Sequence, residues 1–244
     1  DQAGRSGSLL IVADGMGGHA AGNVASNMAV QTFNKHVTAK FPASDLAEVL
    51  RGAVEESNHS IAETVRETAA LKGMGCTLVA AVVQEDRVHW VSVGDSHLYL
   101  VRGGEVQKKN ADHSYGGFLD RMAAQGTPVE AESGFSRNML MSALTGEDIA
   151  DVDCPDDGLL LEPGDRVVIA SDGLDTLSHG QIVEYCAQAE SARGCVEMML
   201  EAVEEAELPK QDNTTIIVIA VAEAGGATKP PSAEAAATGP GPGA

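Results

Sequence analysis

Four aspartates stand at the ends of apolar stretches, and each is followed at once by a small or polar residue. They are Asp14 in LLIVADGMGGH, Asp95 in VHWVSVGDS, Asp172 in VVIASDG and Asp212 in QDNTT. Hard divalent cations prefer carboxylate oxygens, and a flexible residue directly after a strand lets the backbone bring such oxygens together. Each Asp alone fits a turn residue or a helix cap, but together the four favour one metal site.

The donor types indicate which ion would bind. Mg²⁺ and Mn²⁺ keep several waters and take few protein carboxylates, whereas zinc sites use His and Cys. Four scattered aspartates without histidine partners therefore predict Mg²⁺ or Mn²⁺ as the cofactor.

Charge and hydropathy exclude several classes of partner. The 244 residues carry a net charge of 16 − 36 = −20, which argues against nucleic-acid or anionic membrane surfaces. The longest apolar stretches, such as IIVIAVA, fall short of the roughly 18 residues that a membrane span needs. We expect a cytoplasmic monomer with no nucleic-acid or membrane partner.

The four cysteines show no motif. Cys76, Cys154, Cys186 and Cys195 are 78, 32 and 9 positions apart, without a CxxC pair or a histidine at ligand spacing. We interpret them as buried thiols without a role.

The elements expected from residue patterns come in blocks, which indicates an α+β fold. Residues 9–13 form an apolar strand, and a long amphipathic helix begins after Asp45, with Glu48 three positions later as in a capping box. Residues 77–83, 87–93 and 98–101 are rich in β-branched residues and predict an antiparallel meander. Two further strands (167–170 and 214–221) and two helices (181–189 and 191–206) follow.

Composition divides the chain in two. Residues 222–244 hold four of the nine prolines and no large apolar side chain, so they cannot bury enough surface to fold. We expect one compact catalytic domain over residues 1–221 and a disordered Ala/Gly/Pro-rich tail over residues 222–244.

Seven short segments, in this order, resemble the bacterial form of the metal-dependent Ser/Thr protein phosphatases of type 2C. They are DGMGGHAAG, GCTLVAAVV, VGDSHLYLVRGG, ADHS, a later RN, VVIASDG and QDNTT. One DGxGG would be weak evidence, but an ordered set is specific. The resemblance implies a central antiparallel β-sandwich flanked by helical pairs (α-β-β-α), with the metals at one end.

The resemblance also implies roles at matching positions. Asp14 would bridge two metal ions, the Gly15 carbonyl would bind one of them, and Asp172 and Asp212 would complete the second. Asp95 would hold a third, weaker ion together with Asp172. No side chain would act as the nucleophile, since a water shared by ions about 3.5 to 4 Å apart attacks phosphorus.

A flap and three histidines complete the expected site. Residues 116–144 resemble the mobile flap of bacterial members, in which we expect Arg137 to form a salt bridge rather than to contact substrate. His19, His97 and His113 are expected in exposed turns or helix caps.

The start of the chain departs from the family pattern. Asp1 lies 14 − 1 = 13 positions before Asp14, which suits the second member of the family's acidic pair, a metal contact. The preceding acid and the phosphate-binding Arg are missing, so we interpret the chain as N-terminally truncated.

These features predict a bacterial signalling phosphatase that opposes a Ser/Thr kinase and acts on phosphorylated proteins. Two alternatives remain open. One is a catalytically impaired phosphoprotein-binding module of the same fold. The other is a nuclease or nucleotide hydrolase, which the acidic charge and the lack of a GxxxxGK[ST] loop disfavour.

Overall fold

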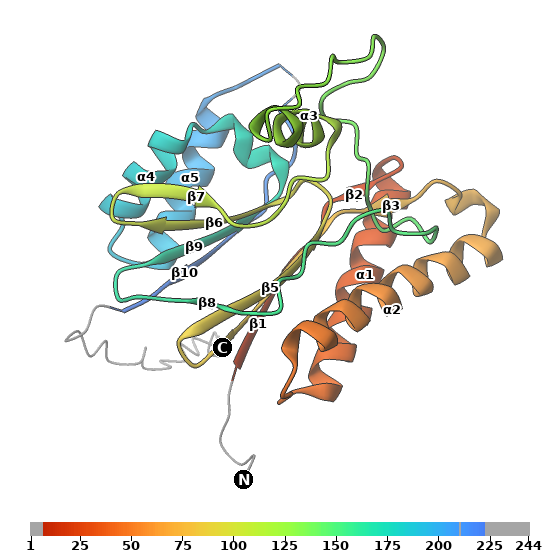
Figure 1. Cartoon of the computed structure of the whole chain (residues 1–244), viewed down its shortest axis with the longest axis horizontal. Helices are drawn as coiled ribbons and strands as arrows, with labels where there is room; N and C mark the ends of the chain where they lie inside the picture. Colours follow the sequence, from red (N-terminus) through yellow and green to blue (C-terminus); the bar gives the residue numbers. More distant parts are fainter. Residues whose placement is uncertain (1–6, 210, 223–244) are drawn as a thin grey trace, which may run out of the picture.

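Two antiparallel sheets lie face to face at the centre of the molecule (Figure 1). The structure is a computed structural model and describes residues 7–209 and 211–222. The first sheet has the order β1 (Gly7–Val12), β4 (Leu78–Gln84), β5 (Arg87–Val93), β8 (Leu159–Leu160). The second has the order β10 (Ile216–Ala220), β9 (Arg166–Ala170), β6 (His97–Arg102), β7 (Glu105–Lys108). The predicted α+β sandwich is confirmed.

Helices α1 (His19–Lys40) and α2 (Leu46–Glu67) cover the outer face of the first sheet (Figure 1). Every fourth residue of α1 from Ala25 to Val37 is buried there, including Phe33. Helix α2 begins as predicted, because the Asp45 side chain accepts a hydrogen bond of 2.9 Å from the backbone N–H of Glu48.

Helices α4 (His179–Gln188) and α5 (Ala192–Glu205) cover the second sheet, so the layers follow the order α-β-β-α. Ser178 and Gln181 form a capping box at the start of α4. The remaining elements are short: β2 (Gly15–Met16), β3 (Gly75–Cys76), η1 (Ala69–Leu71), α3 (Tyr115–Ala124) and η2 (Asp172–Thr176).

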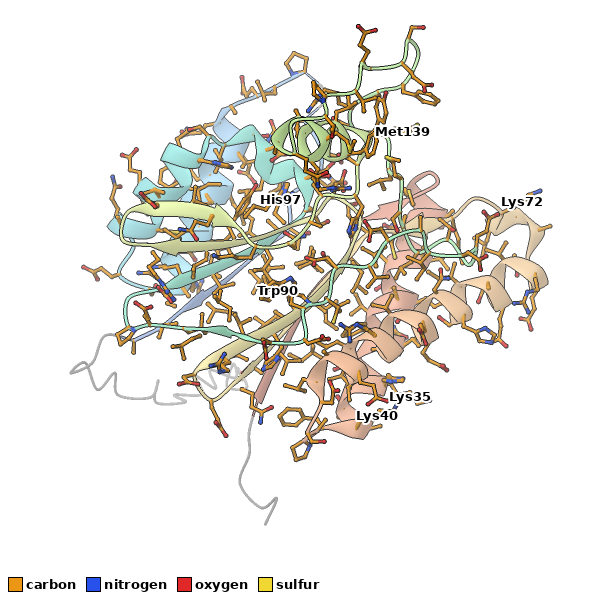
Figure 2. All side chains as sticks on the ribbon, viewed as in Figure 1. Lys35, Lys40, Lys72, Trp90, His97 and Met139 are labelled. Atoms are coloured by element: carbon orange, nitrogen blue, oxygen red, sulfur yellow. The ribbon has the colours of Figure 1, made fainter. Side chains whose placement is uncertain are left out.

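The space between the sheets is filled by apolar side chains from alternate strand positions. In β4, Val79 and Ala81 face the second sheet, whereas Leu78, Ala80 and Val82 pack toward α1 and α2. Trp90 of β5 lies in the layer between the sheets, near the centre of Figure 2. Because both faces of these strands are buried, their sequences are continuously apolar rather than alternating.

The predicted meander is wrong in its third strand. Strand β5 pairs with β4 and β8, whereas β6 pairs with β7 and β9 in the other sheet. The chain crosses between the sheets at Gly94, whose backbone φ is 105°. Glycine adopts this conformation readily, whereas other residues rarely do. A Cβ there would also overlap the side chain of Thr77. This crossing places Asp95 between the two sheets.

Further predictions concern the cysteines, membrane-spanning helices and the two ends of the chain. All four cysteines are buried and free, as predicted. No helix within residues 7–209 and 211–222 is long and apolar enough to span a bilayer. Asp1 and residues 223–244 lie outside the described residues, so the predicted tail and the role of Asp1 stay predictions.

Candidate metal centre

The four predicted aspartates meet in one cavity. Asp14, Asp95, Asp172 and Asp212, together with Gly15, line a space of about 580 Å³. Asp14 follows β1, Asp95 lies between β5 and β6, Asp172 begins η2 after β9, and Asp212 precedes β10. Asp14, Asp95 and Asp172 each lie two positions after the end of a strand, whereas Asp212 lies four positions before the start of β10.

Burial and nearby negative charge raise the pKa of three of these carboxyl groups. Burial first, and then the charges of Asp172 and Asp212, raise the pKa of Asp14 to about 6. Asp14 and Asp172 are close enough to share a hydrogen bond, which raises the pKa of Asp14 further. Burial and the charge of Asp172 raise the pKa of Asp95 to about 6. Burial, followed by the charge of Asp212, also raises the pKa of Asp172.

The donor set fits a hard divalent ion. Oδ1 of Asp172 is buried and has no hydrogen-bond partner among the described residues, which is costly without a cation or water beside it. No His or Cys whose side chain is described lines the cavity. In the part of the chain that the structure describes, no three His, Cys, Asp or Glu side chains are arranged so that they could hold a metal ion together. Such a site suits Mg²⁺ or Mn²⁺, which use few carboxylates and retain waters.

Gly15 lies where only glycine fits. A Cβ on Gly15 would overlap the backbone of Gly22 in α1, so this helix packs directly against the Asp14 turn. The close contact keeps the backbone of Gly15 on the cavity wall beside Asp14.

Thr77 joins the turns that carry two of the aspartates. Its hydroxyl accepts a hydrogen bond of 3.2 Å from the Asp14 backbone N–H, and its own N–H donates to the Asp14 carbonyl at 2.9 Å. The same hydroxyl lies 2.8 Å from Oγ of Ser96, the residue after Asp95. Thr77 thus couples the two sheets at the cavity. Sequence reasoning missed this role, although Thr77 belongs to the segment GCTLVAAVV.

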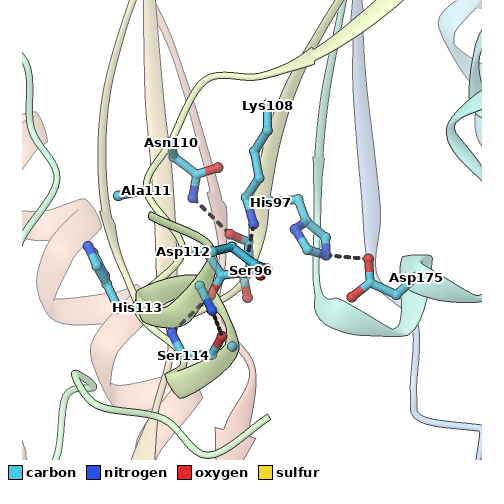
Figure 3. A network of polar contacts seen from close by, with 12 residues as sticks. Ser96, His97, Lys108, Asn110, Ala111, Asp112, His113, Ser114 and Asp175 are labelled. Atoms are coloured by element: carbon cyan, nitrogen blue, oxygen red, sulfur yellow. Dashed lines mark hydrogen bonds and ion pairs between the residues drawn. The ribbon is translucent and has the colours of Figure 1, made fainter. Parts of the chain in front are cut away.

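His113 and Asn110 hold the crossing segment from its other side. The N–H of Gly94 donates to Nδ1 of His113 at 3.1 Å, and the N–H of His113 returns a bond of 3.0 Å to the Gly94 carbonyl. Asn110 donates to the Ser96 carbonyl at 2.8 Å, as Figure 3 shows, and accepts from the N–H of Leu98 at 2.8 Å. These contacts fix the backbone on both sides of Asp95.

The expected exposed positions of two histidines are wrong. His97 and His113 are only 3% and 1% exposed. Nε2 of His97 lies 3.1 Å from Oδ1 of Asp175 in η2, so it links β6 to the element that begins with Asp172 (Figure 3). His19 is the first residue of α1, and nothing is described of its side chain.

The predicted flap forms one wall of the cavity. Residues Asn138, Leu140 and Met141 line the space opposite the aspartates. The flap is anchored to the His113 segment, because the N–H of Met141 donates to the His113 carbonyl at 2.9 Å. Figure 2 shows Met139 of this segment beside α3. Arg137 forms the expected salt bridge, with 2.6 Å between its Nη2 and Oδ2 of Asp120.

Comparison with known proteins identifies the family. The model of protein phosphatase 2C matches residues 2–212. The chain belongs to the protein phosphatase 2C family. It is 36% identical over 221 residues to the Ser/Thr protein phosphatase PstP of Mycobacterium tuberculosis, covering 88% of this chain and 40% of the relative. It is 35% identical over 172 residues to the Ser/Thr phosphatase Stp of Listeria monocytogenes, covering 69% of this chain and 67% of the relative.

Solved structures of the family share the fold. The crystal structure of M. tuberculosis PstP superposes with a TM-score of 0.74 at 31% identity, covering 90% of this chain and 92% of that one. A structure of the PstP catalytic domain in complex with two manganese ions gives a TM-score of 0.70 at 32% identity, covering 89% and 92% of the two chains. The present chain spans less than half the length of the full mycobacterial relative.

The Thr77 contacts generate a first prediction. Thr77→Val keeps a β-branched side chain but removes the hydroxyl that accepts from Asp14 and faces Ser96. We expect a loss of about 1–3 kcal/mol in unfolding free energy, and a several-fold higher Mn²⁺ concentration for half-maximal thermal stabilisation. Thr77→Ser, which keeps the hydroxyl, is the matched control. An unchanged Mn²⁺ response in Thr77→Val would contradict the coupling.

The raised carboxyl pKa values generate a second prediction, for the metal-free protein. The pKa of Asp14 is about 6 in the folded chain against an ordinary value of 3.8. A raised folded pKa gives stability that is fully present below about pH 4 and lost as the pH rises through about 6. Asp14→Asn has no ionisable group at this position and so does not lose this stability. Between pH 4 and pH 7, the unfolding free energy of Asp14→Asn relative to that of the wild type should therefore rise by on the order of 1 kcal/mol.

Chemical denaturation of both proteins in EDTA across this range measures that difference. The comparison with wild type cancels the contribution of other carboxyl groups to the pH dependence of stability. Asp165 is one such group: burial acts to raise its pKa, but Arg102 lowers it overall. If the unfolding free energies of the two proteins changed with pH in parallel, the raised pKa of Asp14 would be contradicted.

Proposed function

We propose that this chain is the catalytic part of a bacterial protein-serine/threonine phosphatase that depends on Mg²⁺ or Mn²⁺. The observation that carries the proposal is the convergence of Asp14, Asp95, Asp172 and Asp212 on one cavity. Membership of the protein phosphatase 2C family and the printed functions of its bacterial relatives support it. Phosphoserine and phosphothreonine in proteins are the proposed substrates.

We propose the specific roles that the family resemblance implies for these residues. Asp14 and the Gly15 carbonyl would hold one ion, and Asp14, Asp172 and Asp212 the second, with Asp1 as a further contact through water. Asp95 would hold a weaker third ion together with Asp172. When bound, such ions polarise the phosphoryl group and lower the pKa of water, so that hydrolysis needs no phosphoenzyme.

The chain itself supplies orientation and charge. Its carboxylates repel a phosphate dianion when no cation is present, so phosphate binding and cation binding are coupled in this proposal. Thr77 holds the Asp14 turn, and the flap residues Asn138 and Leu140 bound the cavity where a substrate side chain would enter. The crowding that raises the carboxyl pKa values is the force that favours cation uptake.

The cellular setting is part of the same proposal. We infer a cytoplasmic monomer whose substrates are a Ser/Thr kinase or the targets of that kinase. Residues 1–221 would form the catalytic domain, and residues 222–244 a tail outside it.

The alternatives are less well supported. The catalytically impaired binding module requires a damaged metal site, whereas all four described aspartates line the cavity. A nuclease or nucleotide hydrolase is disfavoured because the net charge of −20 repels polyanions.

The decisive assay is hydrolysis of p-nitrophenyl phosphate and of a phosphothreonine peptide with and without Mn²⁺. Activity should require Mn²⁺, and Asp172→Ala should lower kcat at least 100-fold by removing a ligand. Asp120→Ala, at the exposed Arg137 salt bridge, is the control and should retain activity. Turnover of ATP in preference to the peptide would favour the nucleotide hydrolase, and tight peptide binding without turnover would favour the binding module.

A further inference from the structure

Two buried cysteines touch each other in the helical layer of the second sheet, away from the metal centre. Sγ of Cys186 in α4 lies 3.4 Å from Sγ of Cys195 in α5. The two side chains are 3% and 0% exposed and belong to the apolar cluster between these helices and the sheet. A disulfide needs a sulfur separation of about 2.05 Å, so the two sulfur atoms are in contact but not bonded and must move closer to form one.

The half-buried Arg166 acts on this pair through its positive charge. Arg166, the first residue of β9, donates from Nη2 to the carbonyl of Ala189 at the end of α4, with a distance of 2.7 Å. Its Nη1 is buried and has no hydrogen-bond partner among the described residues. The charge of Arg166 acts to lower the pKa of both thiols, because opposite charge stabilises an ionised sulfur.

The two thiols are not equivalent. The hydrogen bond from Cys186 lowers the pKa of Cys195 despite burial, and the charge of Arg166 acts in the same direction. The same hydrogen bond, followed by burial, raises the pKa of Cys186. These directions make Cys195 the more acidic of the two thiols, with Cys186 as its hydrogen-bond partner.

The other two cysteines lack these features. Burial raises the pKa of Cys76 to about 12 and that of Cys154 to about 11. Cys154 donates to the Ala47 carbonyl rather than to a second sulfur. Cys76 and Cys154 therefore serve as internal controls for the reactivity of the pair.

We propose that Cys186 and Cys195 form a redox-active dithiol that closes to a disulfide between α4 and α5 when the protein meets hydrogen peroxide. The Cys195 thiolate attacks one peroxide oxygen and the O–O bond breaks. Hydroxide leaves and takes up a proton to become water, and Cys195 becomes a sulfenic acid. The Cys186 sulfur then forms the S–S bond, while the S–O bond breaks and the oxygen leaves as a second water with the Cys186 proton.

In the balance, two thiols are oxidised and one peroxide is reduced to two waters. Burial makes local opening of the helix pair the step that admits the oxidant. The product joins two helices that pack on β9 and β10, the strands next to Asp172 and Asp212, so it stiffens the layer behind half of the proposed metal site.

Peroxide treatment of the intact folded chain, followed by denaturation and alkylation of free thiols, tests the proposal. Two of the four cysteines should escape alkylation, and peptide mapping should join Cys186 to Cys195. The melting temperature should rise by on the order of 5 °C and return after dithiothreitol. Four alkylated cysteines, or a crosslink that includes Cys76 or Cys154, would overturn the proposal.

Variants separate the two sulfurs. Cys186→Ser should form no disulfide and should accumulate a dimedone-reactive sulfenic acid at Cys195, whereas Cys154→Ser should react like wild type. Arg166→Met should slow disulfide formation, while Arg166→Lys should retain part of the rate. If Cys186→Ser fails to fold, the wild-type peptide map and the reversible thermal shift still decide the question.

Discussion

The mutual repulsion of aspartates gathered at the ends of strands is the constraint on which this structure depends. The pKa of Asp14 rises because Asp14 is itself partly buried, and because Asp172 and Asp212 beside it are negative. Such an arrangement destabilises a protein unless a ligand repays it. In the proposed function, divalent cations would remove the repulsion, contact the buried Oδ1 of Asp172 and make the cluster a binding site for phosphate.

The rest of the fold holds that cluster in place. The two sheets supply strand ends from both layers, and the chain crosses between the layers at Gly94, directly before Asp95. Thr77 and His113 then fix the turns by hydrogen bonds to backbone groups rather than to the carboxylates. These bonds do not occupy the carboxylate oxygens, and they hold the backbone that carries Asp14 and Asp95 in one arrangement, as a preorganised site requires.

Local patterns predicted much of this, and long-range contacts account for what they missed. The strands, the capped start of α2 and the four aspartates were predicted because apolar runs, capping residues and donor types are visible over a few positions. The path of β6 into the second sheet was missed, since strand pairing is decided by packing over the whole chain. The Thr77 bond to Asp14 spans 63 residues, and the contact between Cys186 and Cys195 depends on how two helices meet.

The most direct test of the account is a crystal structure of this chain grown with Mn²⁺, with anomalous scattering recorded at the manganese absorption edge. The account predicts strong anomalous peaks inside the cavity, in contact with carboxylate oxygens of Asp14, Asp172 and Asp212. A cavity without such peaks at saturating Mn²⁺, or manganese bound only at the outer surface, would contradict it.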